Sequence, residues 1–399
     1  MSRPAPSVSF DIVIVGGGMV GAALAAALKD APLSVALIEG QAPTPLDNLP
    51  PDLRVSAISR ASQQLLERVD VWGALVDRAC PFRHMHVWDA GGTGSTHFDA
   101  TEIGEPDLGH IVENRRIQHA LWRQLEQQRN LRLLCPARLT HLSNTSAAAQ
   151  LRLDDGTELM ARLAVGADGG RSRVRELAGI ATTGWGYGQK TIVGNVQTSR
   201  PHRNTAWQRF LPSGPVAFLP LYDGSCSIAW HTRSAEADRL MALDDDAFCA
   251  AYTRATGQAL GRVESIGPRG CFPLHRRHAV NYHRGRMVLI GDAAHTVHPL
   301  AGQGANLGFL DAATLGRLLC EAAQDRQDIA AQKLLQTYEH RRRPHNASIM
   351  RAMDLFAGLF ALESAPVRWA RSLGMDVADH SGPLKSWVMR YAMGMNAPI

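Results

Sequence analysis

The segment DIVIVGGGMVGAALAAALK, residues 11–29, decides the fold of this chain. Its first five residues are mostly β-branched and apolar, which predicts a strand buried on both faces of a parallel sheet. Glycines spaced as G-x-G-x-x-G follow, and an alanine-rich stretch then favours a helix as far as about Lys29. A strand, a glycine turn and a helix in this order are typical of a dinucleotide-binding unit.

Each glycine of this motif has a separate physical role. Gly16 permits the tight turn, Gly18 lets a pyrophosphate approach the backbone, and Gly21 permits close packing of the helix on the strand. The amino-terminal end of the helix attracts the phosphates. A second apolar strand, Ser34 to Ile38, ends at Glu39, which is placed to accept hydrogen bonds from a ribose. An acid there suits a free ribose, so the segment predicts NAD or FAD rather than NADP.

Two further segments of glycine and aspartate indicate the size of the nucleotide. Residues 163–166 form a short apolar stretch that runs into GADGGRSRVR, with Asp168 in the turn. Residues 287–290 predict another strand, and GDAAHTVHPLAGQGANLGFLD follows at 291–311, where Asp292 can hold hydroxyls of a ribityl chain. The glycine turn at 302–304 has little side-chain bulk, so its backbone can lie against a flat ring. The helix opening near Ala305 would direct its positive end at that ring. Three separate glycine turns favour FAD over NAD.

These segments carry a family resemblance. The chain resembles the group A flavoprotein aromatic hydroxylases of the p-hydroxybenzoate hydroxylase type. More narrowly, HPLAGQGANLGFLD, residues 298–311, is similar to the signature of the ubiquinone-biosynthesis hydroxylases of the UbiH, UbiF, UbiI and VisC group. The similarity covers essentially the whole chain and includes DLRVSAISRAS (52–62), HIVENRRIQHALW (110–122), GPVAFLPL (214–221) and LKSWVMRYAMG (384–394).

The expected fold class is α/β: a Rossmann-like FAD-binding domain, an inserted antiparallel β-sheet substrate domain and a helical C-terminal tail. The insertion is predicted because helical periodicity mostly lapses between residues 180 and 272, where strand-like segments run at 191–198, 205–211, 216–219 and 226–232. We expect the first part of the FAD-binding domain at 1–180, the substrate domain at 181–274, the second part at 275–345 and a C-terminal helical segment at 346–399.

The resemblance implies which residues hold FAD. Those expected around the adenosine half, the pyrophosphate and the helix that flanks the flavin are Gly16, Gly18, Gly21, Glu39, Arg54, Asn114, Gln118 and Leu139 or its neighbour Arg138. Those expected along the ribityl chain and the isoalloxazine ring are Asp168, Asp292, Pro299, Gly302, Gln303, Gly304, Ala305 and Asn306.

Fewer residues are candidates for contact with the substrate. Among the aromatic residues of the inserted sheet, Phe210, Phe218 and Trp230 are expected to wall a ring-shaped substrate, although each of them would also suit a hydrophobic core. His295 and His298 lie in the flavin segment and are the candidate catalytic residues; the alternative is a role in the turn or in support of other side chains. No metal site is expected.

The resemblance implies an FAD-dependent monooxygenase that hydroxylates the ring of a polyprenylated phenol in ubiquinone biosynthesis. NAD(P)H would reduce the flavin, and a flavin 4a-hydroperoxide would carry the inserted oxygen. One alternative is an FAD oxidoreductase that inserts no oxygen, such as a prenyl reductase. Another is an idle FAD-binding scaffold subunit of a biosynthetic complex. A flavin halogenase is disfavoured because Trp185 stands in GWGYG rather than in a WxWxIP segment.

The composition of the chain indicates which binding partners and which cellular compartment to expect. A net charge of +5, without a basic stripe, gives no support to nucleic-acid binding. The six cysteines have no metal or CxxC spacing, which favours a reducing compartment. We expect a cytoplasmic protein, without a signal peptide or membrane span, that can lie peripherally on the inner face of the membrane. The apolar stripe 384–395 either closes the hydrophobic core or provides contact with the membrane or a partner, without being needed to hold FAD.

Overall fold

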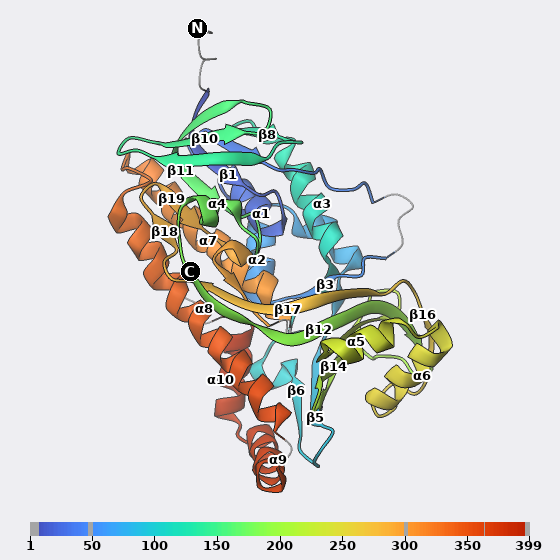
Figure 1. Ribbon diagram of the computed structural model, residues 1–399. Helices are drawn as coiled ribbons and strands as arrows, with labels where there is room; N and C mark the ends of the chain where they lie inside the picture. The colour runs from blue at the N-terminus through green and yellow to red at the C-terminus, as the bar shows by residue number, and fades with distance from the viewer. Residues whose placement is uncertain (1–7, 47–50, 299–301, 363, 396–399) are drawn as a thin grey trace.

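A computed structural model of the chain describes residues 8–46, 51–298, 302–362 and 364–395, and every structural statement below concerns these ranges. Figure 1 shows a parallel sheet with its helices at the top, and a second sheet crossing the middle of the molecule. The C-terminal helices run along one side, from the parallel sheet to the far end. The α/β fold class predicted from the sequence is confirmed by this arrangement.

The first sheet has the Rossmann-like order β18-β19-β11-β1-β2-β8, and the five strands from β19 to β8 pair in parallel. The strands on this path are β1 (Val8–Val15), β2 (Val35–Ile38), β8 (Leu131–Leu134), β11 (Glu158–Gly166), β18 (His283–Arg284) and β19 (Met287–Leu289). An antiparallel extension from β11 consists of β10 (Ala149–Leu153) and β9 (Leu139–Asn144). Ile12, Val13 and Ile14 are fully buried, as expected for a strand covered on both faces.

Glycines bring two helices close together beside this sheet. Helix α1 (Met19–Ala27) packs against α7 (Gln303–Gln324) and α3 (Asn114–Leu125). A Cβ added to Gly308 of α7 would lie 2.5 Å from the Val20 side chain of α1, so the two helices approach only because residue 308 has no side chain. The remaining helices of this region are α2 (Arg60–Arg68) and α4 (Arg173–Leu177), with short 3₁₀ turns η1 (Trp72–Ala74), η2 (Val76–Arg78), η3 (Ala100–Ile103) and η4 (Gly291–Ala293).

The second sheet has nine strands in the order β20-β17-β12-β15-β14-β13-β5-β6, with β16 beside β12. Its strands are β5 (His84–Asp89), β6 (Ser95–Asp99), β12 (Thr182–Thr198), β13 (Thr205–Leu211), β14 (Gly214–Pro220), β15 (Cys226–Arg233), β16 (Val263–Ile266), β17 (Gly270–Ala279) and β20 (His295–Thr296). Four of them coincide with the predicted strand segments. Helices α5 (Ser234–Met241) and α6 (Asp245–Ala255) cover one face and were not foreseen.

The second sheet draws on more of the chain than residues 181–274. Strands β5 and β6 come from the first expected segment, and β20 comes from the third. Strand β13 pairs with β5 in parallel, so residues 121 positions apart in sequence, such as Thr205 and His84, lie side by side. A small third sheet has the antiparallel order β3 (Val55–Ile58), β7 (His110–Glu113) and β4 (Cys80–Pro81).

The C-terminal part consists of α8 (Gln332–Ala361), α9 (Ala365–Asp379) and α10 (Pro383–Ala392). Helix α8 continues through Pro344, although a proline there removes one backbone hydrogen bond. Arg342 and Asn346 on either side of Pro344 are tied to Asp311 of α7, which holds the helix in place. Within the described ranges, no helix has the length and apolar character needed to cross a bilayer.

The apolar face of α10 differs from the predicted stripe. Met389 and Met393 are buried, whereas Trp387 and Val388 of the predicted stripe are about half exposed. The sequence could not distinguish these faces because apolar residues occur all round this short helix. Only the packing of α10 against η3 shows which side is covered.

Candidate FAD site

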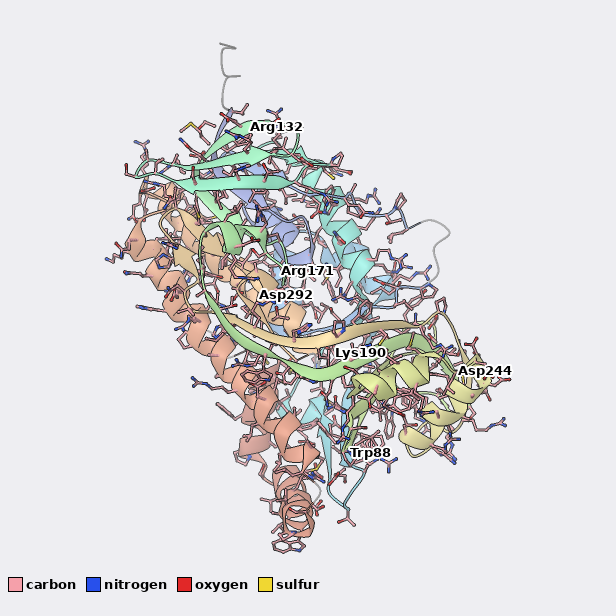
Figure 2. All side chains as sticks on the ribbon, in the orientation of Figure 1. Trp88, Arg132, Arg171, Lys190, Asp244 and Asp292 are labelled. Carbon is pink, nitrogen blue, oxygen red and sulfur yellow. The ribbon has the colours of Figure 1, made fainter. Side chains whose placement is uncertain are left out.

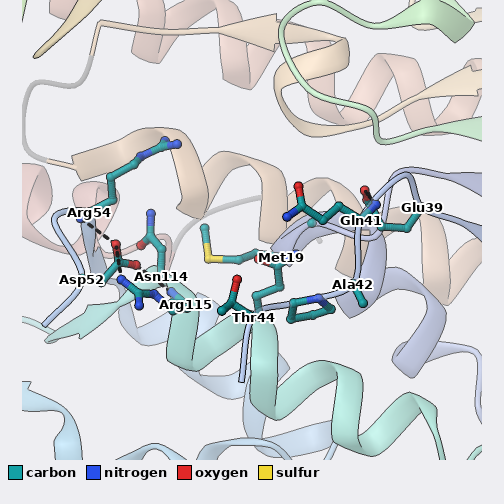
Figure 3. A pocket seen from close by; sticks show the side chains of 12 residues that line it. Met19, Glu39, Gln41, Ala42, Thr44, Asp52, Arg54, Asn114 and Arg115 are labelled. Carbon is teal, nitrogen blue, oxygen red and sulfur yellow. Dashed lines mark hydrogen bonds and ion pairs between the residues drawn. The ribbon is translucent and has the colours of Figure 1, made fainter. Parts of the chain in front are cut away.

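A polar cavity of about 510 Å³ lies at the carboxyl ends of β1 and β2. Figure 3 shows it as an elongated site, with Glu39 and Gln41 toward one end, Arg54 and Asn114 toward the other, and Met19 between them. Its lining residues are Gly18, Met19, Glu39, Gln41, Ala42, Pro43, Thr44, Asp52, Arg54, Asn114, Arg115 and Gln118. Five of these residues were predicted: Gly18, Glu39, Arg54, Asn114 and Gln118.

The glycine turn leaves space where a pyrophosphate would lie. Gly16 has φ +107°, and an added Cβ would lie 2.4 Å from the Ala167 carbonyl oxygen. A Cβ on Gly21 would lie 2.0 Å from the Gly16 carbonyl oxygen, so both positions require glycine for packing. A Cβ on Gly18 would meet no atom within 4 Å. Because α1 has neither a capping side chain nor an acidic residue in its first turn, its amide groups are free to bind an anion.

Glu39 contributes to this turn as well as to the cavity. Its carboxylate accepts hydrogen bonds from the Gly17 amide at 2.6 Å and from the Gln41 amide at 3.1 Å. Its carbonyl oxygen accepts from the Ala137 amide at 2.9 Å, which brings the segment before β9 beside it. The acid therefore holds the glycine turn in place. Its contact with a ribose stays a prediction.

Helix α3 supports the glycine turn from the other side. The side chains of Gln118 and Trp122 both donate to the Gly17 carbonyl oxygen, at 3.1 and 2.7 Å. Asn114 accepts a hydrogen bond from the Ser56 hydroxyl at 2.7 Å through its side-chain oxygen. Its amide nitrogen remains directed at the cavity (Figure 3). Trp122 was missed from the sequence, because an apolar side chain in a helix gives no sign of a backbone partner.

Asp52 and Arg54 close the far end of the cavity. Asp52 accepts from the backbone amides of Arg54 and Arg115, at 3.2 and 2.9 Å, and also pairs with the Arg115 guanidinium (Figure 3). Among the described residues, Arg54 itself has no ion-pair partner, and its guanidinium lies 6.0 Å from the ring centroid of Phe272. An exposed, unpaired arginine in a cavity is suited to bind phosphate. Asp52 was missed, although it opens the quoted segment DLRVSAISRAS.

The two predicted aspartates have different surroundings. Asp292 follows β19 at the edge of the parallel sheet that faces the second sheet (Figure 2). The side chain of Asp292 is exposed to solvent. The protein around it nevertheless raises the pKa of its carboxyl group, and the charges of His295 and Arg54 oppose this rise. The contact of Asp292 with the ribityl chain stays a prediction. Asp168, by contrast, accepts hydrogen bonds from Ser172 and from the first amides of α4. It shapes that turn, and its contact with FAD stays a prediction.

The start of α7 is attached to β3. Gly302 adopts the left-handed conformation with φ +62°, and an added Cβ would lie 3.3 Å from Ala57. The buried side chain of Asn306 accepts from the Ser59 amide and donates to the Ala57 carbonyl oxygen, at 3.0 and 2.8 Å. Gly304 and Ala305 lie in the first turn and are half-buried. Pro299 lies outside the described residues, and the side chain of Gln303 is not among those described.

His295 belongs to a buried network instead of facing the cavity. Its Nε2 lies 2.5 Å from Asp311, which also accepts from the Gly291 amide at 3.0 Å and from Arg342 at 2.8 Å. Burial would raise the pKa of Asp311, but His295 and Arg342 hold its pKa well below its usual range. Through Asp311, His295 supports the Gly291–Asp292 turn, which agrees with the alternative role in the turn. A catalytic role for His295 stays a prediction.

His298 is a different case. It is buried, and neither ring nitrogen has a hydrogen-bond partner among the described residues. Its ring packs edge-on against Tyr187 at 4.8 Å and lies 5.2 Å from His231. Burial lowers the pKa of His298 to about 4, with Asp354 opposing the shift, so it is neutral at pH 7. A catalytic role for His298 stays a prediction.

The three aromatic residues expected to wall the substrate are all buried, and their contact with a substrate stays a prediction. Phe218 and Trp230 pack against Tyr252 in the core beneath α5 and α6, because strand alternation directs them to that face. Phe210 faces the opposite way but stacks on Phe360 of α8 at 3.9 Å. The side chain of Leu139 is buried in the core, and Arg138 lies beside Gly40. The expected contact of Arg138 or Leu139 with the adenine would be made through backbone groups, and it stays a prediction.

A second, apolar cavity of about 130 Å³ lies between β3, the β5–β6 hairpin and α10. It is lined by Ala57, Ser59, Phe82, Met85, Phe98, Leu108, Asn306, Val388, Met389, Ala392 and Met393. Its two polar side chains, Ser59 and Asn306, are engaged with protein partners. An occupant of this cavity would therefore meet mainly apolar groups.

The glycine turn, the terminal acid of β2 and the elongated polar cavity define a protein that binds the adenosine diphosphate half of a dinucleotide. The family comparison identifies the dinucleotide. Residues 9–353 match the model of the FAD binding domain family, and the chain belongs to that family. The free amides of α1, the unpaired Arg54 and the open space at Gly18 fit the diphosphate of FAD.

Two relatives align over nearly the whole chain. The chain is 39% identical over 387 residues to 3-demethoxyubiquinol 3-hydroxylase of Escherichia coli, covering 96% of this chain and 98% of that protein. It is 41% identical over 384 residues to ubiquinone hydroxylase UbiL of Rhodospirillum rubrum, covering 96% and 89%. These matches confirm the predicted relationship to the ubiquinone-biosynthesis hydroxylases.

A solved structure shows the same fold at lower identity. The p-nitrophenol 4-monooxygenase PnpA of Pseudomonas putida superposes with a TM-score of 0.81 and 18% sequence identity, covering 99% of this chain and 100% of that chain. The arrangement of a parallel sheet, an antiparallel sheet and C-terminal helices is therefore shared by proteins whose sequences have diverged widely.

Replacing Glu39 by Ala is expected to weaken FAD binding about 100-fold. The variant loses the acceptor expected to bind the ribose, and it also loses the bond that holds the Gly17 amide. Two hydrogen bonds to a charged acceptor contribute about 3 kcal/mol or more together, which corresponds to a factor of about 100 or more. Titration of the apoprotein with FAD, followed by flavin fluorescence, measures the change. Glu126→Ala, at an exposed position on the end of α3, is the control, and equal affinities in both variants would remove the role of Glu39.

Proposed function

We propose that this protein is an FAD-dependent monooxygenase that hydroxylates the aromatic ring of a polyprenylated phenol in ubiquinone biosynthesis. NAD(P)H would supply the electrons and molecular oxygen the inserted atom. Support comes from the names of the two full-length relatives and from the family match. The chemistry of oxygen activation belongs to the reduced flavin. The chain itself must bind the flavin, orient the phenol and exclude water.

The observation that carries this proposal is that the segment 52–59, which contains β3, contributes residues to both cavities. Arg54, just before β3, lines the polar cavity, and Ala57 and Ser59, three and five residues later, line the apolar one. The first turn of α7 lies against the same strand through Gly302 and Asn306. A ring held at this strand could therefore face a flavin while its prenyl chain fills the apolar cavity. The positive end of α7 would favour negative charge on the cofactor.

Water exclusion depends on α10. Met389 and Met393 are buried against Phe82 and Leu108, and they complete the wall of the apolar cavity. The Ala61 amide donates to the Met393 carbonyl oxygen at 3.3 Å, which links the end of α10 to α2. A truncation before Pro383 would remove this wall. Loss of hydroxylation by such a truncation would therefore not by itself demonstrate a membrane role.

The test uses FAD-loaded protein, NADH or NADPH in separate reactions, isotopically labelled oxygen and a phenol with a short prenyl chain. Mass spectrometry should find one labelled oxygen atom on the aromatic ring. A saturated prenyl chain without labelled oxygen would instead establish the reductase alternative. Binding of FAD without oxygen uptake or product, with either nucleotide, would establish an idle subunit.

We further propose that the C-terminal helices contact a membrane surface. Trp369, Leu373 and Val377 repeat every four residues along α9, and they are 69%, 48% and 59% exposed. The opposite side of α9 is attached to the protein, since Arg371 forms a buried ion pair with Asp89 at 2.6 Å. An outward apolar stripe that includes a tryptophan suits the interface of a bilayer, where a polyprenylated substrate is found.

Simultaneous replacement of Trp369, Leu373 and Val377 by Ser should reduce binding to lipid vesicles by about 100-fold, because the lost apolar area corresponds to about 3 kcal/mol. FAD content and turnover of a short soluble phenol should stay unchanged. Vesicle sedimentation measures the binding. Val76→Ser, at an exposed position on η2, is the control. Equal sedimentation of the wild-type protein and the triple variant would exclude α9 as the contact.

A further inference from the structure

Four potential metal ligands occupy one face of the β5–β6 hairpin. In the antiparallel pairing, His84 lies opposite Asp99, and His86 lies opposite His97. Because successive residues of a strand point to opposite faces, these four side chains share one face. The other face carries Met85 and Phe98, which line the apolar cavity. Figure 2 shows Trp88 on this hairpin at the far end of the molecule from Arg132 in the parallel sheet.

Three of these side chains converge on one point. Ligand atoms of His84, His97 and Asp99 all lie within 4.8 Å of one another. Nδ1 of His84 is 3.4 Å from Oδ2 of Asp99, and the rings of His84 and His97 are stacked with centroids 5.4 Å apart. Tetrahedral zinc with bonds of about 2.0–2.2 Å places its ligand atoms about 3.3 Å apart, so small side-chain rotations would close the site.

The ligand atoms are also free to bind. The buried Nδ1 of His84 has no hydrogen-bond partner among the described residues. The other carboxylate oxygen of Asp99 accepts from the amide and the hydroxyl of Thr101, at 2.8 and 2.7 Å, which turns Oδ2 toward His84. A supporting partner that orients a ligand in this way is a regular feature of metal sites.

His86 and two tryptophans lie beside the cluster. The ring of His86 is 6.0 Å from that of His97. The His86 ring also lies 5.2 Å from Trp88 and 5.3 Å from Trp207. An ion bound to the cluster would therefore be close enough to affect tryptophan fluorescence.

We propose that His84, His97 and Asp99 form a binding site for a divalent transition-metal ion, for which zinc is the best fit. Two imidazoles and one carboxylate are a ligand set that zinc accepts, with water or His86 in the fourth position, and imidazoles disfavour magnesium and calcium. The ion would hold β5 to β6 and thereby fix one wall of the apolar cavity. This site is separate from the FAD cavity and does not depend on the proposed reaction.

The test is calorimetric titration of FAD-loaded protein, free of any histidine tag, with zinc chloride. One zinc ion per chain is expected. His97→Ala, at an exposed position, should lower the affinity at least about 10-fold, and Thr101→Val, which removes only support for Asp99, should lower it less. Copper(II) should quench tryptophan fluorescence in the wild-type protein but much less in His97→Ala. His141→Ala, another exposed strand histidine, is the control.

Unchanged zinc affinity in His97→Ala, or binding of magnesium as tight as that of zinc, would overturn the proposal. His84 is half-buried, so His84→Ala could fail to fold; His97→Ala, whose side chain is exposed, then decides the question. Circular dichroism and flavin content verify that each variant is folded before the titration.

Discussion

Replacement of Asp311 by Ala should destabilise the protein by about 3–5 kcal/mol. Asp311 and Arg342 are both fully buried, and the carboxylate binds Arg342, His295 and the Gly291 amide together. Removing it leaves the Arg342 cation buried with only its Asn346 and Leu307 partners. Loss of one member of a buried ion pair typically costs this much, a large share of a total stability of about 5–15 kcal/mol.

Urea unfolding of the apoproteins, followed by tryptophan fluorescence, measures the difference. Asp328→Ala is the matched control, because Asp328 also pairs with two arginines but lies at the surface, where such a loss is about 1 kcal/mol or less. Asp311→Ala should also bind FAD weakly, because the turn that carries Asp292 loses the carboxylate that accepts from the Gly291 amide. Equal stability of the two variants would show that the buried network contributes nothing beyond a surface pair.

Gly18→Val should yield a folded protein without bound flavin. Gly18 has φ −66° and ψ −179°, a conformation open to any residue, and a Cβ there meets no protein atom within 4 Å. The stability should therefore change by about 1 kcal/mol, the difference between residues at the start of a helix. The new side chain would occupy the position of the pyrophosphate. Loss of two charge-assisted hydrogen bonds corresponds to at least about 100-fold in FAD affinity.

Two matched variants separate binding from folding. Gly21→Val places its Cβ against the Gly16 carbonyl oxygen, so it should lose both stability and flavin. Gly73→Val lies on η1, where an added Cβ again meets no atom within 4 Å, and it should lose neither. Flavin absorbance of the purified protein and urea unfolding measure the two properties. A yellow Gly18→Val protein of normal FAD affinity would place the pyrophosphate elsewhere.

The sequence of residues 11–39 was sufficient to predict the end of the cofactor site that the glycine turn and Glu39 form. The strand, the glycines and Glu39 lie within residues 11–39, so their spacing alone determines how they come together. The same applies to β13, β14 and β15, whose lengths and turns can be read from neighbouring residues. Arg54, Asn114 and Gln118 were placed through the family resemblance, because nothing in their own neighbourhoods indicates a shared cavity.

Tertiary structure alone decided which faces of the second sheet are covered and which residues line the apolar cavity. Phe218 and Trp230 are aromatic residues on predicted strands, but their direction depends on which face of the sheet α5 and α6 cover. The apolar cavity joins β3, the β5–β6 hairpin and α10, which are far apart in sequence. The sequence pattern of a strand predicts that successive side chains point to opposite faces of the sheet. It does not show which of the two faces is covered, because that depends on elements elsewhere in the chain.

The buried Asp311 network and the histidine cluster illustrate the same division. The sequence determined that Asp311 follows the flavin segment and that His84, His86, His97 and Asp99 alternate along two short stretches. It did not show that Arg342 lies 2.8 Å from Asp311, or that His84 lies opposite Asp99. Local interactions between neighbouring residues specify the elements and the glycine turn. The charge pairs and ligand clusters form only when elements distant in sequence pack, so their energies cannot be assigned before the fold is known.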